Sequence, residues 1–203
     1  MYIPKHFHMK EEDILAFVKE YPFGILISQS PDGIKATHIP FLLKQTNDSF
    51  VLVGHMAEEN QHAKFLNLGE HLIILNGSHA YISSSWYKNT NVSTWNYEAV
   101  HLYGTIRILN EVELVNALTD LTNTYESHQE NPRTMDKIPD KMVKAYIREI
   151  VGFEFQPTKI EAKSKLSQNR NKEDYHSIVN HLEKQNDFLA HQVAEQMKKK
   201  GLK

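Results

Sequence analysis

A two-residue alternation is the strongest constraint in this sequence. From residue 100 to 108, apolar side chains alternate with polar ones. The apolar set is Val100, Leu102, Ile106 and Ile108, and the polar set is His101, Tyr103, Thr105 and Arg107. Successive side chains of a β-strand point to opposite faces. The pattern therefore predicts a strand with one core face and one face rich in hydrogen-bonding groups.

Other short strands separated by turns surround this one. Strands are expected at 23–28, 34–44, 50–55, 72–75, 99–109 and 151–162, with turns at 31–33 and 47–49. Helical spacing of apolar residues predicts helices at 11–21, 58–68, 112–125 and 139–150, and a loop is expected at 76–91. Successive strands with few helices between them indicate a small antiparallel barrel. The predicted fold class is mostly β with α additions.

The last part of the chain has a different pattern. From Glu173 onward, apolar residues follow one helical stripe, which breaks near Gln185 and ends in a basic run at 198–200. One long C-terminal helix is predicted. The expected organisation is a barrel domain at 1–170, followed by a C-terminal helical extension at 171–203.

Composition removes several classes of function. Cysteine is absent, which excludes disulfides, thiol catalysis and zinc sites built on cysteine pairs. A formal net charge of -2 gives no support to nucleic-acid binding through a basic face. The Rossmann, P-loop, esterase and zinc-protease motifs are missing. Without a signal-peptide or membrane-spanning run, the expected location is the cytoplasm, with no membrane partner.

Three further segments hold unusual sets of polar and aromatic residues. Segment 54–65 offers histidine, asparagine and lysine after a strand, 78–97 holds both tryptophans among hydroxyls and amides, and 165–170 holds two cations. Each has an ordinary interpretation: a strand–helix joint, tryptophans that cap the core, and a loop before a helix. With the polar face of 101–107, they also meet the needs of flavin mononucleotide (FMN): aromatic walls, amides for the ring edge and cations for the phosphate.

Seven short motifs resemble those of a known family. In order, YIPKHF, HIPFLL, GHMAEEN, HAYISSSWY, VSTWNYEAVHLYG, IVGFEF and KLSQNR are similar to successive motifs of the PaiB-type FMN-binding negative transcriptional regulators. YISSSWY, TWNY and KLSQNR are the most specific blocks. The resemblance implies an FMN-binding split β-barrel similar to that of pyridoxamine phosphate oxidases, present as a homodimer with two sites across its interface.

The resemblance also implies which residues bind FMN. His38 stands where related barrels place a cation. Related flavin oxidases have an arginine and a lysine near the phosphate, where this sequence has Gln61 and His62. The polar face of 100–108 would look into the FMN site or the dimer seam, closed by the Trp-Asn-Tyr before it. The implied set is His38, His55, Asn60, His62, Lys64, Trp95, Asn96, His101, Lys165, Gln168 and Arg170. No catalytic residue or metal ligand is assigned.

Three functions are compatible with the sequence. The family is named for repression of protease-production and sporulation genes, which favours a dimeric FMN-binding repressor that acts on DNA directly or through another regulator. The alternative is a flavin-dependent oxidoreductase with an indirect regulatory effect, so enzymatic activity is left undecided. A barrel without cofactor that serves as an interaction module is the third. Since no helix-turn-helix pattern accompanies the basic residues at 159–172, they favour flavin phosphate over DNA.

Overall fold

The computed structural model describes residues 1–45 and 49–202. Its elements in chain order are η1 (Lys5–Phe7), α1 (Glu11–Glu20), β1 (Phe23–Ser30), β2 (Gly33–Pro40), β3 (Leu42–Gln45), β4 (Phe50–Ala57), η2 (Gln61–Phe65), β5 (His71–Ile82), η3 (Ser84–Trp86), β6 (Thr94–Ile108), α2 (Glu111–Glu126), η4 (Met135–Lys137), α3 (Asp140–Ile147), β7 (Ile150–Lys165), α4 (Lys172–Glu183) and α5 (Phe188–Lys200). The turn predicted at 47–49 lies, except for Ser49, outside the described residues.

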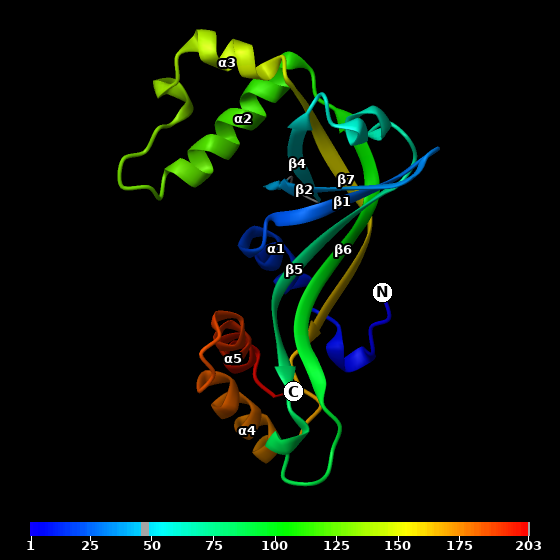
Figure 1. The fold of residues 1–203 in the computed structure, drawn as a ribbon, viewed down its shortest axis with the longest axis vertical. Helices are drawn as coiled ribbons and strands as arrows, with labels where there is room; N and C mark the ends of the chain where they lie inside the picture. The colour runs from blue at the N-terminus through cyan, green and yellow to red at the C-terminus, as the bar shows by residue number, and fades with distance from the viewer. Residues whose placement is uncertain (46–48, 203) are drawn as a thin grey trace. The chain divides into compact units, whose positions relative to one another are not determined.

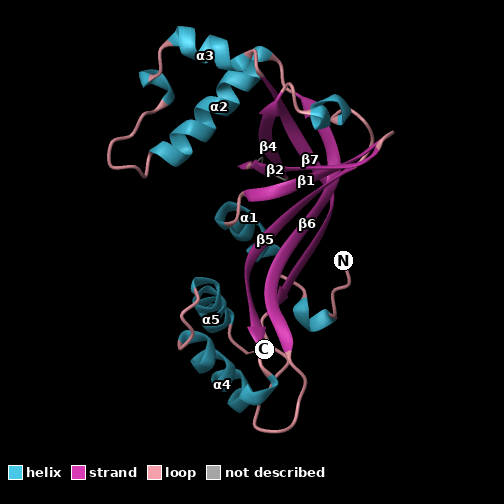
Figure 2. Cartoon of the chain, viewed as in Figure 1, coloured by secondary structure: helices cyan, strands magenta, loops and turns pink. Residues whose placement is uncertain are grey.

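Seven strands form one antiparallel sheet. Neighbouring strands hydrogen-bond in the order β2-β1-β5-β6-β7-β4-β3 (Figure 1). β1 and β2 form a hairpin in which Ser30 pairs with Gly33, and the φ of +106° at Gly33 is one that glycine adopts without strain. β3 and β4 form a second hairpin. The predominance of strands, with helices added before, between and after them (Figure 2), confirms the predicted fold class.

Two predicted elements in the first third of the chain are wrong. The single strand predicted at 34–44 is divided into β2 and β3. Pro40 has no N–H to continue a ladder, and Phe41 donates its N–H to the carbonyl oxygen of Pro22 at 2.8 Å. The helix predicted at 58–68 is reduced to the short 3₁₀ turn η2, which is capped by Asn60 and followed by Gly69 with φ of +70°.

The loop predicted at 76–91 is wrong over its first seven residues, 76–82. β5 continues to Ile82, so the strand predicted at 72–75 extends into this segment, whereas β6 begins at Thr94, beyond it. At the end of β5, Ala80 and Ile82 are buried while their neighbours on the opposite face are exposed. Burial alternates up to Gly77 and again from Ser78 to Ile82, so the strand continues through this polar segment with a change of phase at Gly77 and Ser78.

The tail consists of two helices rather than the single predicted one. The chain turns between α4 and α5, and the carboxylate of Asp187 accepts hydrogen bonds from the backbone N–H groups of Leu189 at 2.8 Å and Ala190 at 3.4 Å. Asp at this position satisfies N–H groups that a new helix leaves without partners, so it starts α5. The division into a domain at 1–170 and an extension at 171–203 stays a prediction.

Two compact units make up the chain. The first, called here the helix-covered unit, consists of Met1–Tyr21, Leu75–His101 and the chain from Glu161 onward. The second, the hairpin unit, consists of Pro22–Ile74 and Leu102–Ile160. β5, β6 and β7 contribute residues to both. No helix of the described residues has the length and apolar character needed to cross a membrane.

Helices cover one face of the strands in the helix-covered unit. Side chains of α4 and α5 form a buried cluster with those of β5, including Ala80, Ile82, Ile178, Leu182, Val193 and Met197. Phe17 of α1 packs over Gly77, where an added Cβ would lie 2.8 Å from its ring. Burial of each large apolar side chain contributes roughly 1.5–3 kcal/mol. This face of the strands therefore holds the tail helices in place.

An aromatic core fills the hairpin unit. Phe41, Phe153 and Phe155 are almost fully buried, and the rings of Phe41 and Phe153 meet edge to face with centroids 6.5 Å apart. Gly104 interrupts the apolar face of β6 because β7 passes very close to it. A Cβ at this position would lie 2.1 Å from the carbonyl oxygen of Gln156.

We expect Gly104→Ala to destabilise the protein by at least about 2 kcal/mol, because the new methyl group would displace backbone rather than a flexible side chain. Urea unfolding followed by circular dichroism measures the loss. Gly69→Ala is the control: its φ is +70° but nothing lies within 4 Å of an added Cβ, so it should cost only about 1–2 kcal/mol. Equal losses for the two variants would contradict the close approach of β6 and β7.

Candidate functional site

The open face of the helix-covered unit carries a cluster of aromatic side chains. Trp95 on β6 is 52% exposed and Tyr81 on β5 is 47% exposed. Their ring centroids lie 5.9 Å apart in an edge-to-face arrangement, and the imidazole of His79 lies 6.1 Å from the indole. Large aromatic side chains seldom remain this exposed in a group without a binding role. We call this cluster the aromatic face.

A hollow of about 380 Å³ opens beside the aromatic face. Its lining residues are Asn76, Gly77, His79, Trp95, Tyr97 and Glu98. The alternation of β6 places Trp95 and Tyr97 on the open side, whereas Asn96 is buried on the side of the helices. The ammonium group of Lys163 lies 5.1 Å from the centroid of the Tyr97 ring, so a cation accompanies the aromatic wall.

This hollow fits the ring system of a flavin. Trp95 and Tyr97 offer flat apolar surfaces, and the amide of Asn76 offers both donors and an acceptor for a polar ring edge. Its volume lies within the range of small-molecule sites. Among the described lining residues, however, none is a cation for the phosphate of FMN. The hollow therefore offers surfaces for a flat ring, and Lys163 on the Tyr97 ring is a cation beside its wall.

Of the other predicted FMN residues on the strands of this unit, Asn96 and Lys165 form hydrogen bonds within the chain, and His101 is half-buried. Asn96 is fully buried, and its amide exchanges hydrogen bonds with the hydroxyl of Ser167 at 3.0 and 3.1 Å. His101 is half-buried, and burial lowers its pKa. Lys165 donates a hydrogen bond to Thr94, and burial lowers the pKa of its ammonium group.

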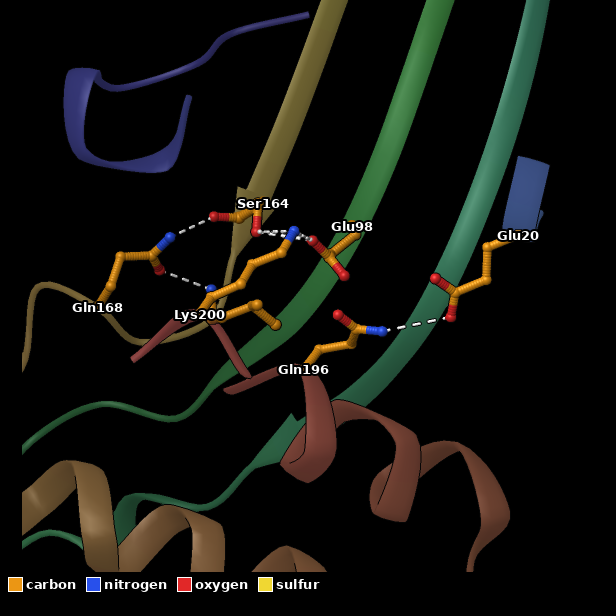
Figure 3. Close-up of polar contacts among 7 residues, drawn as sticks. Glu20, Glu98, Ser164, Gln168, Gln196 and Lys200 are labelled. Carbon is orange, nitrogen blue, oxygen red and sulfur yellow. Dashed lines mark hydrogen bonds and ion pairs between the residues drawn. The ribbon is translucent and has the colours of Figure 1, made fainter. Parts of the chain in front are cut away.

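The two predicted residues that follow β7 are also engaged. Gln168 accepts a hydrogen bond from the N–H of Leu166 at 2.7 Å and donates one to the carbonyl oxygen of Ser164 (Figure 3). The guanidinium group of Arg170 lies 4.7 Å from the centroid of the Tyr87 ring. Within this unit, Trp95 is therefore the predicted residue that lies in the hollow, and a role for the other five in FMN binding stays a prediction.

A buried polar network lies in the hairpin unit, around two histidines. His62 Nε2 and His71 Nδ1 each lie 2.6 Å from the hydroxyl oxygen of Ser28. His62 Nδ1 lies 2.8 Å from the hydroxyl oxygen of Thr37, which also accepts a hydrogen bond from the amide of Asn60 at 3.4 Å. Both histidines are 2% exposed and Ser28 is 1% exposed. We call these five residues the Ser28 network.

The geometry of the Ser28 network favours one direction of hydrogen bonding. A serine hydroxyl has a single proton, so one imidazole must donate to it while the other accepts from it. Thr37 accepts from Asn60, which leaves its own proton for His62 Nδ1. His62 then donates to Ser28 through Nε2, and Ser28 donates to His71 Nδ1. Both imidazoles are neutral in this arrangement.

Electrostatics agrees with neutral imidazoles. Burial lowers the pKa of His62, and the neighbouring His71 and Lys35 lower it further. Burial also lowers the pKa of His71, against a smaller opposite effect of the backbone of Leu66. Two positive charges this close together would repel each other. Burial in the Ser28 network therefore favours the neutral form of both histidines.

The remaining predicted residues of the hairpin unit lie apart from the Ser28 network. The ring of His38 on β2 stacks on that of Phe23 at 5.9 Å, and Lys64 is exposed on η2. His55 lines a small hollow with apolar side chains of β4 and α2, and burial lowers its pKa. The structure thus brings Asn60 and His62 together and leaves His38, His55 and Lys64 separate. Their part in binding FMN also stays a prediction.

The polar face of β6 between residues 101 and 107 is only partly available for a ligand. Arg107 donates to both carboxylate oxygens of Glu113 at 2.9 Å and lies 3.5 Å from Glu154. Glu113 also belongs to the capping box of α2 with Asn110. Arg107 therefore fixes the start of α2. Lys159 lies 4.7 Å from the centroid of the Tyr103 ring.

Sequence reasoning did not single out Asn76, His79 and Tyr97 as lining residues of a hollow, nor Ser28, Thr37 and His71 as partners of His62. For Tyr97 the signal is the two-residue period of β6, which places it on the side of Trp95, whereas Asn76 and His79 are three residues apart on β5, so that period does not bring them together. For the partners of His62 the signal is strand register, because Ser28 pairs directly with His71 across β1 and β5. Register between distant strands cannot be read from one sequence.

Comparison with known proteins identifies the family. A family model described as "Putative FMN-binding domain" matches residues 1–159. The chain belongs to this family. It is 40% identical over 202 residues to the Bacillus subtilis protein named protease synthase and sporulation protein PAI 2, with 98% of each chain covered. FMN is accordingly the cofactor of this domain, and the resemblance to the PaiB-type family is confirmed.

Solved structures support the same fold. A conserved hypothetical protein, Rv2991, from Mycobacterium tuberculosis matches with a TM-score of 0.60 at 16% identity, covering 84% of this chain and 94% of that one. The FAD and heme binding protein from Mycobacterium smegmatis matches with a TM-score of 0.55 at 13% identity, covering 77% of this chain and 71% of that one. At such identities the likeness concerns the fold alone. Together with the family match, it confirms the predicted FMN-binding split barrel.

The Ser28 network predicts that stability falls in weak acid. The folded-state pKa values of His62 and His71 lie below the ordinary value of 6.5, so the unfolded chain binds more protons as the pH falls through 6.5. Stability is complete above that pH and decreases below it, by at most about 1.4 kcal/mol per pH unit for each histidine. Urea unfolding at pH 7.5, 6.5 and 5.5, chosen as roughly one-unit steps around the ordinary pKa, measures this slope.

The double variant His62→Gln and His71→Gln should flatten that slope, even if it is less stable at every pH. His176→Gln, at an exposed position of α4, serves as the matched control. A slope as steep in the double variant as in the control would show that the acid response arises elsewhere.

Proposed function

We propose that this protein is an FMN-binding negative regulator of protease-production and sporulation genes. The observation that carries the proposal is the 40% identity to the Bacillus subtilis protein PAI 2 over 98% of both chains, which leaves no large part of either protein unmatched. A likeness over a single segment would support only a shared domain. The expected cytoplasmic location belongs to the same proposal.

The aromatic hollow is the proposed site of the flavin ring. Trp95 and Tyr97 would hold the ring by stacking, and Asn76 would fix its orientation by hydrogen bonds to the polar edge. When bound, FMN would supply reversible electron transfer, while these residues only bind and orient it. The exposure of Trp95 would leave one side of the ring open to a partner.

A homodimer is the proposed assembly. Tyr81 and Trp95 are about half exposed in one patch, and Val92 nearby in sequence is 74% exposed. A soluble monomer seldom presents contiguous aromatic surface without a partner. The resemblance to the PaiB-type family, which implies two sites across a dimer interface, supports a second copy as that partner.

Action through another regulator fits the charges better than direct contact with DNA. Cations of the basic segment lie against aromatic rings, as Lys159 does on Tyr103 and Arg170 on Tyr87. In the basic run of α5, Lys198 pairs with Glu183 and Lys200 with Glu98. Cations held in this way offer little to phosphates of a duplex.

A flavin-dependent oxidoreductase is the second candidate function. The observation that favours it is the same exposure of Trp95, because a ring held there could meet an electron donor from solution. Anaerobic mixing of the FMN-loaded protein with NADH or NADPH tests it through bleaching of the flavin absorption. Turnover with an electron acceptor would support this candidate, and a flavin that neither donor reduces would remove it.

The hollow predicts that Trp95→Leu weakens FMN binding. Loss of a stacked ring removes roughly 0.5–1.5 kcal/mol, which corresponds to about a two- to tenfold rise in Kd. Quenching of flavin fluorescence on addition of protein measures the affinity. Phe188→Leu, in the same unit but on α5, is the matched control because Phe188 is 74% exposed and outside the hollow. Equal affinities for the two variants would exclude the hollow as the ring site.

Indirect regulation predicts that the dimer alone does not retard promoter fragments of protease and sporulation genes in an electrophoretic mobility assay. Direct repression would instead give retardation that weakens steeply, by about 10³-fold or more, between roughly 50 and 200 mM salt. Light scattering on the same sample gives the mass. A monomer would contradict the proposed assembly, whatever the outcome of the assay.

A further inference from the structure

A buried carboxylate lies on the helix-covered side of β6. The side chain of Glu98 is 1% exposed, and the hydroxyl of Ser164 donates a hydrogen bond to it at 2.7 Å. The ammonium group of Lys200 forms an ion pair with the same carboxylate oxygen (Figure 3). A carboxylate buried to this degree requires both a cation and hydrogen-bond donors. Glu98 and Ser164 thus form a site built for an ammonium group.

The ammonium that fills this site comes from the last turn of α5. Lys200 keeps 24% of its side chain exposed, so it reaches Glu98 from the solvent side rather than from within the core. Gly201 follows it and ends the helix. Lys200 also approaches the hydroxyl of Ser164 at 3.4 Å. Chemically, Lys200 presents a primary ammonium group on a four-carbon chain, which a free alkylamine can match.

A chamber of about 230 Å³ adjoins the ion pair, and we call it the Glu98 chamber. Its wall includes the apolar side chains of Met9, Phe17 and Leu166, the amides of Gln168 and Gln196, and the carboxylates of Asp13 and Glu20 on α1. Gln196 donates a hydrogen bond to Glu20 at 3.3 Å (Figure 3). The volume exceeds that of several water molecules but is smaller than a typical site for a drug-sized ligand. Its occupant must be small.

Three lysines (Lys10, Lys199 and Lys200), three carboxylates (Asp13, Glu20 and Glu98) and His8 line the chamber, so the preference for a cation rests on the buried carboxylate of Glu98. Lys200 is committed to Glu98, and Lys10 forms an ion pair with Glu12 at 3.1 Å. An anion would have to face the carboxylates of Glu98 and Glu20. A cation with a short apolar stem would meet a carboxylate at one end and apolar wall along its length.

We propose that the Glu98 chamber binds a small primary alkylammonium compound, and that Lys200 is the tethered group that this ligand replaces. The ligand would take over the ion pair with Glu98, and its stem would lie along Phe17 and Leu166. Release of Lys200 would free the last turn of α5, so that ligand binding would loosen the C-terminal end of this helix. All the contacts belong to the helix-covered unit, and the inference does not rest on the proposed regulatory function.

The test is a rescue experiment with n-butylammonium chloride on the full-length protein. Lys200→Met removes the tethered ammonium and keeps the stem, so it should lower Tm, and n-butylammonium should restore Tm in a saturable way. Because a tethered competitor reduces apparent affinity, wild type should bind the ligand about tenfold or more weakly than Lys200→Met. Lys198→Met, which breaks the exposed pair with Glu183, is the matched control. Addition of n-butylammonium should raise its Tm no more than that of wild type.

Three results would overturn the proposal. One is an equal effect of n-butylammonium on Lys200→Met and Lys198→Met. Another is equal rescue by n-butanol, which has the stem without the charge. The third is rescue that persists in the double variant Glu98→Gln and Lys200→Met. If Lys200→Met does not fold, titration of ¹⁵N-labelled wild type decides: saturable shifts at the amides of Ser164 and Gln196 are expected, and unchanged signals would refute the site.

Discussion

The alternation of side chains along β6 decides what each face of the helix-covered unit can do. Asn96 and Glu98 are buried on the side of the helices, while Trp95 and Tyr97 look toward the open side. A register shift of one residue would exchange the two sets and place the aromatic rings under α5. The aromatic hollow and the Glu98 chamber are therefore two consequences of one strand.

Each unit also contains a buried polar network whose hydrogen bonds form only in the packed state. In the hairpin unit, one serine hydroxyl joins the imidazoles of His62 and His71. In the helix-covered unit, Glu98 depends on Ser164 and on Lys200, a partner 102 residues away in sequence. Breaking either network would leave a buried polar group without partners, which costs more than the bond itself contributes. Such networks favour one packing over others that bury similar apolar area.

Patterns among neighbouring residues predicted much of the fold. The rest depends on contacts between residues far apart in the sequence. The alternation at 100–108 and the apolar spacing of α1, α2 and α3 depend on neighbouring residues, so these elements were predicted. The polar run Asn76–Gly77–Ser78 hides the continuation of β5, and the N-cap at Asp187 divides a helix whose apolar stripe otherwise continues. For the site, family resemblance indicated Trp95 and His62. The sequence did not indicate Ser28 and His71, because their contact depends on the register between β1 and β5. It did not indicate Lys200, because its contact with Glu98 depends on how α5 packs on the strands.

The most direct test of the aromatic hollow uses the two tryptophans of the chain as internal probes. Trp95 lines the hollow, whereas Trp86 stacks on His181 beside the helical core, with ring centroids 5.1 Å apart. In a ¹H–¹⁵N spectrum each indole N–H gives its own signal, and FMN is titrated into the flavin-free protein. The account predicts a large, saturable shift of the Trp95 signal with Trp86 nearly unchanged. A Trp95 signal that does not move while FMN binds would contradict it.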